Sequence, residues 1–247
     1  MELEGRVAIV TGAAMGIGRA IAHELAKEGA DLVLADLLVE EANKVVDEVS
    51  TMGRKAIAVK MDVTKSAEVN QMVKKALDEF GKIDILVNNA GGGARERMSQ
   101  FSESTEDVWD YVIARNLKGV LICSRAVIEH MIQRRSGKII SMASSTGITG
   151  LAGAVDYSAA KAGVIGFTMS LAKEVIKYGV YVNCVSPGPI ETSAVKDKTP
   201  EQMEALRQLY GMGRIGKPEE IAYMIAFLAS DRANFISGQN MRVFGPR

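Results

Sequence analysis

The sequence is poor in the residues that build disulfide frameworks, metal centres and membrane spans. Its 247 residues include only two cysteines and two histidines, too few ligands for a zinc site. Cys123 and Cys184 stand far apart in apolar segments, so we expect two buried thiols. No apolar run approaches the roughly 20 residues that a membrane helix needs, and the first residues show no basic or apolar leader. We therefore expect a cytoplasmic protein without a metal.

An excess of charge of either sign is also missing. The chain has 30 basic and 30 acidic side chains, which gives a formal net charge of zero. Binding to nucleic acid or to an anionic membrane surface depends on a basic surface, so neither is expected as a partner. A chain of this length buries a sufficient core without disulfides. It fits one α/β domain spanning residues 1–247.

Short β-branched runs alternate with longer segments of helical periodicity. The runs are apolar throughout, which indicates strands covered on both faces and hence a parallel sheet. Repeated strand-helix-strand units predict a doubly wound, Rossmann-like α/β fold with helices on both faces. An irregular stretch at about 188–212, with a short helix near 201–209, is expected to form a loop and lid. The predicted strands are 7–11, 32–35, 56–61, 83–88, 138–142 and 180–186.

A glycine-rich loop follows the first predicted strand and leads into a helix. Gly12, Gly16 and Gly18 would allow a tight turn, close approach of the backbone to a phosphate, and packing of the helix on the strand. The helix N-terminus would then direct its free N–H groups at a pyrophosphate. The sequence therefore predicts a dinucleotide site that also includes Met15 and Ile17.

Asp36 ends the second strand, where a dinucleotide fold carries its ribose-binding carboxylate. A carboxylate there would accept hydrogen bonds from the ribose hydroxyls of NAD and repel the additional phosphate of NADP. Leu37 and Leu38 follow in place of basic residues, so we predict NAD (NADH) as the cofactor. The alternative is that Asp36 only caps the next helix.

Polar residues also follow the third and fourth strands at the same edge of the sheet. Ligands of open parallel sheets bind beyond the carboxyl ends of the strands. We therefore expect these residues to border the adenine and its ribose, although each motif taken alone resembles an ordinary turn. They are Asp62 and Val63 after the third strand, and Asn89, Ala90 and Gly91 after the fourth.

Tyr157 and Lys161 are four residues apart in a predicted helix, a spacing that places phenol and ammonium on one face. A free tyrosine has a pKa of about 10, so it needs a nearby cation to exchange a proton near neutral pH. Such a pair also arises by chance on surface helices. Ser144 precedes this helix and would hydrogen-bond the reacting oxygen, with Ser145 as its rival.

In their order and spacing, these motifs resemble the short-chain dehydrogenase/reductase family. The resemblance covers essentially the whole chain, and the combination is specific although no single motif is. It rests on Thr11-Gly-x-x-x-Gly16-x-Gly18, Asp62, Asn88-Asn89-Ala90-Gly91, Asn116, Ser144, Tyr157-x-x-x-Lys161 and Pro187-Gly188.

The resemblance implies a catalytic tetrad and its reaction. Ser144 would polarise the alcohol or carbonyl oxygen, and Tyr157 would exchange its proton while hydride passes to or from nicotinamide. Lys161 would bind the nicotinamide ribose and lower the pKa of Tyr157. Asn116 would hold a water that links Lys161 to solvent. The implied nicotinamide contacts are Pro187, Gly188, Ile190 and Thr192, besides Tyr157 and Lys161.

Within the family, we predict an NAD-dependent dehydrogenase that interconverts a secondary alcohol and a ketone on a small hydrophobic, cyclic or hydroxyacyl substrate. The alternative is an NADPH-dependent 3-oxoacyl-acyl-carrier-protein reductase. Asp36 argues against it, as does Tyr178, which stands where such reductases carry a second basic residue beside Arg135. An alternative of another class is a catalytically silent dinucleotide-binding regulator, but no tetrad residue is missing.

The substrate pocket is expected to be mostly apolar, which suits a hydrocarbon ring or chain. Its lining would come from the loop 92–98, where Arg95 and Arg97 are either anion ligands or solvated charges, from Ser145, Ile148 and Leu151, and from the lid residues Met203, Leu206 and Tyr210. The helices at 109–134 and 157–178 resemble those that pair in homotetramers of the family. The closing Phe244-Gly245-Pro246-Arg247 departs from the acidic residue and glycine pair more usual there.

Overall fold

A computed structural model describes residues 1–92, 99–192, 195, 198–209 and 211–246. Its centre is a seven-stranded sheet in the order β3-β2-β1-β4-β5-β6-β7, in which every neighbouring pair is parallel. The predicted doubly wound α/β class is therefore confirmed. The strands are β1 (Val7–Thr11), β2 (Asp31–Asp36), β3 (Ala56–Lys60), β4 (Ile85–Asn88), β5 (Gly137–Met142), β6 (Val180–Pro187) and β7 (Asn240–Val243).

The strand β7 is the one that the sequence did not predict. It has only four residues, carries Asn240 and Arg242, and is only partly buried, so it lacks the uniformly apolar pattern of the other strands. It pairs with β6 in a register that sets Cys184 opposite Asn240 and Pro187 opposite Val243. The end of β7 therefore lies beside the end of β6, at the edge of the sheet where a ligand is expected.

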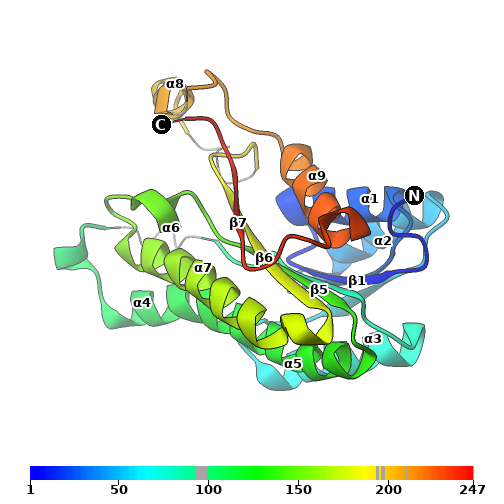
Figure 1. The fold of residues 1–247 in the computed structure, drawn as a ribbon. Coiled ribbons are helices and arrows are strands. Elements are labelled where there is room, and N and C mark those ends of the chain that lie inside the picture. Colours follow the sequence, from blue (N-terminus) through cyan, green and yellow to red (C-terminus); the bar gives the residue numbers. More distant parts are fainter. Residues whose placement is uncertain (93–98, 193–194, 196–197, 210, 247) are drawn as a thin grey trace.

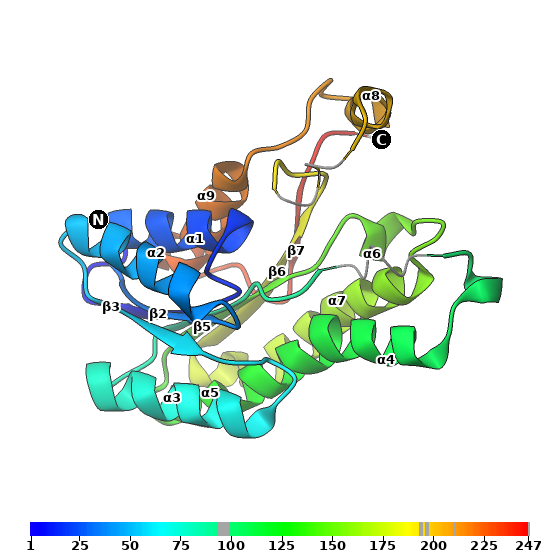
Figure 2. The same cartoon turned by 180° about the vertical axis from the view of Figure 1, so that it is seen from behind.

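Helices cover both faces of the sheet (Figures 1 and 2). The helices α1 (Gly16–Lys27), α2 (Val39–Thr51) and α9 (Pro218–Ala229) lie on one face, and α3 (Ser66–Phe80), α5 (Gly119–Arg134) and α7 (Val155–Val175) lie on the other. Alternate residues of each strand therefore enter different cores: Ala8 and Val10 pack with the first group, and Ile9 with the second. None of the helices in the described part of the chain is long and apolar enough to cross a membrane.

The remaining elements are short, except for α8 of the predicted lid. Its observed bounds, Pro200–Leu209, agree with the helix expected near 201–209. Both cysteines are buried free thiols, as expected, and burial raises the pKa of Cys123 to about 12. The short elements are η2 (Phe101–Glu103), α4 (Glu106–Ile113), the π-helical turn η3 (Ala114–Lys118), α6 (Thr146–Thr149), η4 (Ile176–Tyr178) and η6 (Asp231–Ala233).

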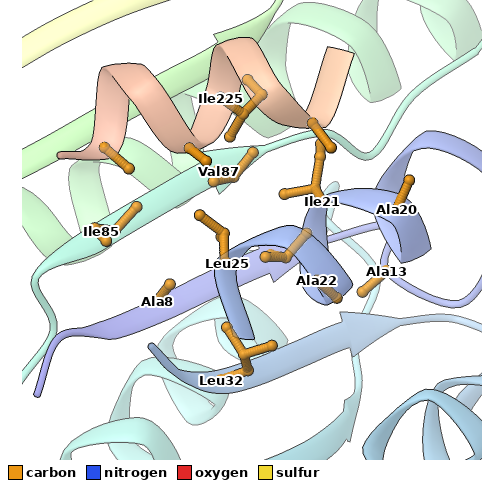
Figure 3. Packing of buried hydrophobic residues seen from close by; sticks show 14 of the residues in the cluster. Ala8, Ala13, Ala20, Ile21, Ala22, Leu25, Leu32, Ile85, Val87 and Ile225 are labelled. Carbon is orange, nitrogen blue, oxygen red and sulfur yellow. The ribbon is translucent and has the colours of Figure 1, made fainter. Parts of the chain in front are cut away.

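The position of α1 is fixed by its apolar face. Figure 3 shows Ile21 and Leu25 of α1 and Ile225 of α9 in one cluster next to the sheet, and all three side chains are fully buried. Because α1 is held between β1 and α9, its first turn stays at the carboxyl end of β1. The chain continues from β1 through β2 to β3 on one side, whereas β4 lies on the other side of β1. Ligands of such sheets bind at this change of direction.

Shortening a side chain in this core tests the packing that anchors α1. We expect Ile21→Ala to lower the free energy of unfolding by about 2–4 kcal/mol, because the mutation leaves a cavity that its neighbours only partly fill. The half-exposed Met52 serves as the control, and Met52→Ala is expected to cost about 0.5 kcal/mol or less. Urea denaturation at one protein concentration measures both. Equal losses in the two variants would contradict this account of α1.

Candidate dinucleotide-binding and catalytic site

A cavity of about 800 Å³ opens at the carboxyl ends of the strands, around the junction of β1 and β4. Its size lies within the range of small-molecule and cofactor sites. Every residue predicted to bind the cofactor lines it, and so do Ser144 and Ser145. From the prediction, the structure brings together here Gly12, Met15, Gly16, Ile17, Gly18, Asp36, Asp62, Val63, Asn89, Ala90, Gly91, Tyr157, Lys161, Pro187, Gly188, Ile190 and Thr192.

The glycine loop has no room for a side chain at Gly12 and Gly18. Gly12 has a φ of +66°, a left-handed conformation that favours glycine. A Cβ on Gly18 would lie 1.9 Å from the carbonyl oxygen of Gly12. The first turn of α1 begins at Gly16, and no side chain caps its N-terminus. Its free N–H groups and this open cradle fit the pyrophosphate of a dinucleotide.

Asn89 holds this loop to the neighbouring strand. Its Nδ2 donates hydrogen bonds to the carbonyl oxygens of Thr11 (3.0 Å) and Gly12 (2.9 Å). The Thr11 hydroxyl oxygen in turn accepts the backbone N–H groups of Asn89 and Ala90. The cavity wall formed by Asn89 is thus also the clamp between β1 and β4.

The Asp36 carboxylate lies between the glycine loop and the start of α2. One oxygen accepts the backbone N–H of Ala14 at 3.0 Å, and the other accepts that of Leu38 at 2.9 Å. Leu38, not Asp36, is the N-cap residue of α2, and no side chain caps this helix. Asp36 lines the cavity together with Leu37 and Leu38. It therefore combines a structural contact to the loop with a charge at the cavity wall.

Asp62 and Val63 shape the far wall of the cavity. One Asp62 carboxylate oxygen accepts hydrogen bonds from the backbone N–H (2.9 Å) and the hydroxyl (2.7 Å) of Thr64. Val63 packs against the start of α5, where a Cβ on Gly119 would lie only 2.8 Å from its side chain. These contacts fix the turn after β3 in place.

Asn116 is fully buried in the π-helical turn η3 between α4 and α5. Its Nδ2 donates to the carbonyl oxygens of Gly92 and Val112, and its Oδ1 accepts the N–H of Gly92, each at 2.9 Å. A Cβ on Gly91 would lie 2.7 Å from this Oδ1 and 3.5 Å from Nζ of Lys161. Asn116 thus lies behind the cavity wall, close to Lys161, and π-helical turns of this kind often occur at functional sites.

Lys161 and Tyr157 lie on the cavity face of α7, as their spacing predicted. Nζ of Lys161 donates to the carbonyl oxygen of Met142 at 2.7 Å and lies 5.7 Å from the centre of the Tyr157 ring. Only 3% of Lys161 is exposed. Burial lowers its pKa to about 8, an effect that the nearby Cys184 partly opposes. The ammonium is therefore still the main form at neutral pH, beside the phenol ring.

The two rival serines differ in their exposure. Ser145 is buried, with only 3% of its surface accessible, whereas Ser144 is partly exposed within the cavity. The Ser144 hydroxyl oxygen accepts hydrogen bonds from the backbone N–H (3.2 Å) and the hydroxyl (3.0 Å) of Thr146. Those bonds leave the Ser144 O–H proton available to a ligand, which favours Ser144 for the polarising role.

The expected substrate pocket is only partly tested. Leu151 and Leu206 line the cavity, whereas Ile148 and Met203 do not appear in its lining. Residues 93–98, with Arg95 and Arg97, and Tyr210 lie outside the described residues. Two basic residues of the lining, Arg115 and Lys198, were not predicted from the sequence. Within the described ranges, no cluster of His, Cys, Asp and Glu side chains could hold a metal ion.

Comparisons with known proteins agree with this geometry. The sequence model of the short chain dehydrogenase family matches residues 6–203. The chain is 40% identical, over all of its length and 98% of the relative, to (2S)-[(R)-hydroxy(phenyl)methyl]succinyl-CoA dehydrogenase subunit BbsD of Thauera aromatica. It is also 40% identical to the 3-oxoacyl-[acyl-carrier-protein] reductase FabG of Thermotoga maritima, over 99% of this chain and 98% of the relative.

A solved structure extends the similarity to three dimensions. The crystal structure of gox2181 superposes with a TM-score of 0.93 at 34% sequence identity, covering 98% of this chain and 95% of that one. Both the sequence and the fold therefore match along nearly the whole chain. The protein belongs to the short-chain dehydrogenase/reductase family and is an oxidoreductase that acts on CH–OH groups and the corresponding ketones.

Proposed function

We propose that the protein interconverts a secondary alcohol and a ketone with NAD(H) as its cofactor. The observation that carries this proposal is the joint presence of Ser144, Tyr157 and Lys161 in the cavity that also contains the glycine loop and Asp36. A dinucleotide with its pyrophosphate at the start of α1 would occupy both sides of the cavity, the side of Asp36 and the side of Ser144, Tyr157 and Lys161. The four residues proposed to act in catalysis are Asn116, Ser144, Tyr157 and Lys161.

Each of these residues has a distinct task in the proposed reaction. A bound nicotinamide would supply or accept the hydride. Ser144 donates a hydrogen bond to the substrate oxygen, which stabilises the charge that develops on it. Tyr157 takes the hydroxyl proton during oxidation and returns it during reduction. The buried ammonium of Lys161 favours the phenolate form of Tyr157, and Asn116 fixes the Gly91–Gly92 backbone beside Lys161.

The proposed preference for NAD(H) rests on charge. Asp36 places a carboxylate at the cavity wall, and the residues that follow it are Leu37 and Leu38, about half exposed. A 2′-phosphate near Asp36 would meet a like charge without a basic residue beside it in sequence. The ribose hydroxyls of NAD would instead donate hydrogen bonds to the carboxylate.

The lining of the cavity supports a hydroxyacyl or other largely apolar substrate. Leu151, Val195 and Leu206 supply apolar surface, and Lys198 adds a positive charge. By name, one relative acts on a substituted succinyl thioester of coenzyme A and another on a 3-oxoacyl group carried by a protein. We therefore infer a hydroxyacyl thioester as the first substrate class to test, ahead of cyclic secondary alcohols.

The alternative activity is that of an NADPH-dependent 3-oxoacyl-acyl-carrier-protein reductase, and several relatives of this kind support it. Against it stand the charge of Asp36 and the surface near α5. There, Nη2 of Arg135 donates to the carbonyl oxygen of Lys177 at 3.1 Å, and Tyr178 replaces a second basic residue. A silent regulatory role is less well supported, because all four catalytic positions are occupied by suitable residues.

We further propose a cytoplasmic homotetramer. On the helices that family members pair, Leu121 of α5 and Met169 of α7 have 40% and 49% of their surface exposed, respectively. Val120 and Val164 of the same helices are instead buried in the core of this chain. These exposed apolar side chains support an interface that involves α5 and α7, and sedimentation of the purified protein would measure the number of subunits.

Replacing the phenol hydroxyl tests the acid/base role. We expect Tyr157→Phe to lower kcat by roughly 10²- to 10⁴-fold, the usual contribution of a general acid/base, with NADH affinity unchanged. Tyr223 is exposed on α9, so Tyr223→Phe is the matched control and should retain full activity. Steady-state kinetics and NADH fluorescence titration provide the readouts. Substantial turnover by Tyr157→Phe would overturn the assignment.

Neutralising Asp36 tests the cofactor preference. Asp36→Asn keeps an oxygen that can accept the N–H of Ala14 but removes the charge. We expect the ratio of NADH to NADPH affinity to fall by about tenfold or more, since like charges a few ångströms apart repel by more than about 1 kcal/mol. Asp47→Asn, on the exposed side of α2, is the control. A wild-type preference for NADPH would favour the carrier-protein reductase, and a ratio that Asp36→Asn leaves unchanged would mean that the carboxylate has only a structural role.

The burial of Lys161 predicts that this residue is required for activity but lowers the stability of the folded protein. Because the folded-state pKa of Lys161 is about 8, below its ordinary value, burial of its charge opposes folding at pH values below 8. This penalty fades as the pH rises through 8 toward the unfolded pKa. We expect Lys161→Met to be inactive yet more stable than the wild type at pH 7, with a smaller difference at pH 10. Thermal unfolding at both pH values measures it, and a destabilised variant at pH 7 would contradict the argument.

A further inference from the structure

The segment that follows β7, residues 244–246, lies against the part of the lid that follows α8. Figures 1 and 2 both show the end of the red strand β7 leading to a position beside α8. The backbone N–H of Gly211 donates a hydrogen bond to the carbonyl oxygen of Pro246 at 2.8 Å. We call residues 244–246 the strap.

The contact between the strap and the lid depends on two glycines. Gly245 is buried, and a Cβ on it would lie 2.4 Å from Cγ of Met212. On the opposite side, a Cβ on Gly211 would lie 3.2 Å from Cγ of Pro246. A side chain at position 245 would therefore collide with Met212, and one at position 211 would crowd Pro246.

The strap begins at the end of β7, which is held by backbone hydrogen bonds at the edge of the sheet. β7 pairs with β6 as far as Pro187 and Val243, and the N–H of Gly188 donates to the carbonyl oxygen of Val243 at 3.3 Å. Pro187 and Gly188 themselves line the cavity. The strap thus connects the floor of the cavity to the lid above it.

The described part of the lid has few other attachments, apart from the bonds of the Arg214 guanidinium to the Glu220 carboxylate of α9. Its base is closed by the pairing of Pro189 and Glu191 with Gly216, through backbone hydrogen bonds of 2.9 and 2.8 Å. Between residues 192 and 215, the bond from Gly211 to Pro246 is the one backbone hydrogen bond to a distant part of the chain among the described residues. α8 lies in this interval, and its Leu206 lines the cavity.

We propose that Gly245 and Pro246 are positioning residues: by holding Gly211 and Met212, they keep α8 over the cavity and so set the affinity for substrate and reduced cofactor. They touch neither the catalytic residues nor the cavity, so the rate of the chemical step does not depend on them. This inference rests on the proposed function, since a substrate and NADH are the ligands that the lid would cover.

The test introduces a methyl group into the contact. We expect Gly245→Ala to raise KM for the substrate and the dissociation rate of NADH about fivefold, the effect of losing one backbone hydrogen bond. The rate of hydride transfer in a single turnover should stay within about twofold of the wild type, because only binding is altered. Gly245→Ala/Met212→Ala removes the side chain that the new Cβ meets and should restore both values, whereas Met212→Ala alone is the control.

Hydrogen exchange of α8 separates this proposal from the proposed function. The amides of 201–209 should exchange faster in Gly245→Ala than in the wild type or in the double variant, whether or not a substrate is known. Faster exchange without any NADH-linked turnover would overturn the proposed function but would still support the proposal that the strap positions α8. Unchanged exchange, KM and NADH dissociation in Gly245→Ala would overturn the proposal that the strap positions α8. If Gly245→Ala does not fold, Gly211→Ala, with its milder contact of 3.2 Å, replaces it under the same criteria.

Discussion

The narrow space between the glycine loop and α1 governs the geometry of the site. A Cβ on Gly18 would lie 1.9 Å from the carbonyl oxygen of Gly12 and 2.6 Å from Nδ2 of Asn89, so no side chain at position 18 fits between α1, the loop and Asn89. Asn89 is in turn bonded to Thr11 and Gly12 of the first strand and its loop. The N-terminus of α1 therefore cannot turn away from the sheet without breaking the junction of β1 and β4, and both halves of the cavity depend on that junction.

Most of the sheet could be predicted because six of its strands have a recognisable pattern in their own sequence. A parallel strand covered on both faces needs apolar residues in succession, and six runs of this kind became β1 to β6. β7 did not follow this rule, since an edge strand that is only partly buried tolerates Asn240 and Arg242. What makes residues 240–243 a strand is their pairing with β6, more than 50 residues earlier in the chain, and no short pattern records such a partner.

The candidate site likewise contains residues that could be predicted from the sequence and residues that could not. The glycine loop, Asp36 and the Tyr157–Lys161 pair are short motifs, so their residues could be named from the sequence alone. The surroundings of Asn116 could not, because they depend on a π-helical turn and on bonds to Gly92, which the packing of distant segments creates. Arg115 and Lys198 were missed for a related reason: exposed charges are common, and nothing in their sequence context indicates that they face a cavity.

The π-helical turn also limits how the chain tolerates insertions and deletions. Its hydrogen bonds run from residue i to i+5, so it holds one residue more than an α-helical turn would. Deleting one residue from 114–118 would return this turn to α-helical geometry and leave the flanking helices in phase, because the π-helical turn is what accommodates the extra residue. The buried Val120, Cys123 and Val127 of α5 would keep their places. The backbone around Asn116, which sets its bonds to Gly92 and Val112, would change. The number of residues in this turn is therefore a requirement of the site, through the position of Asn116, and not of the packing of α5.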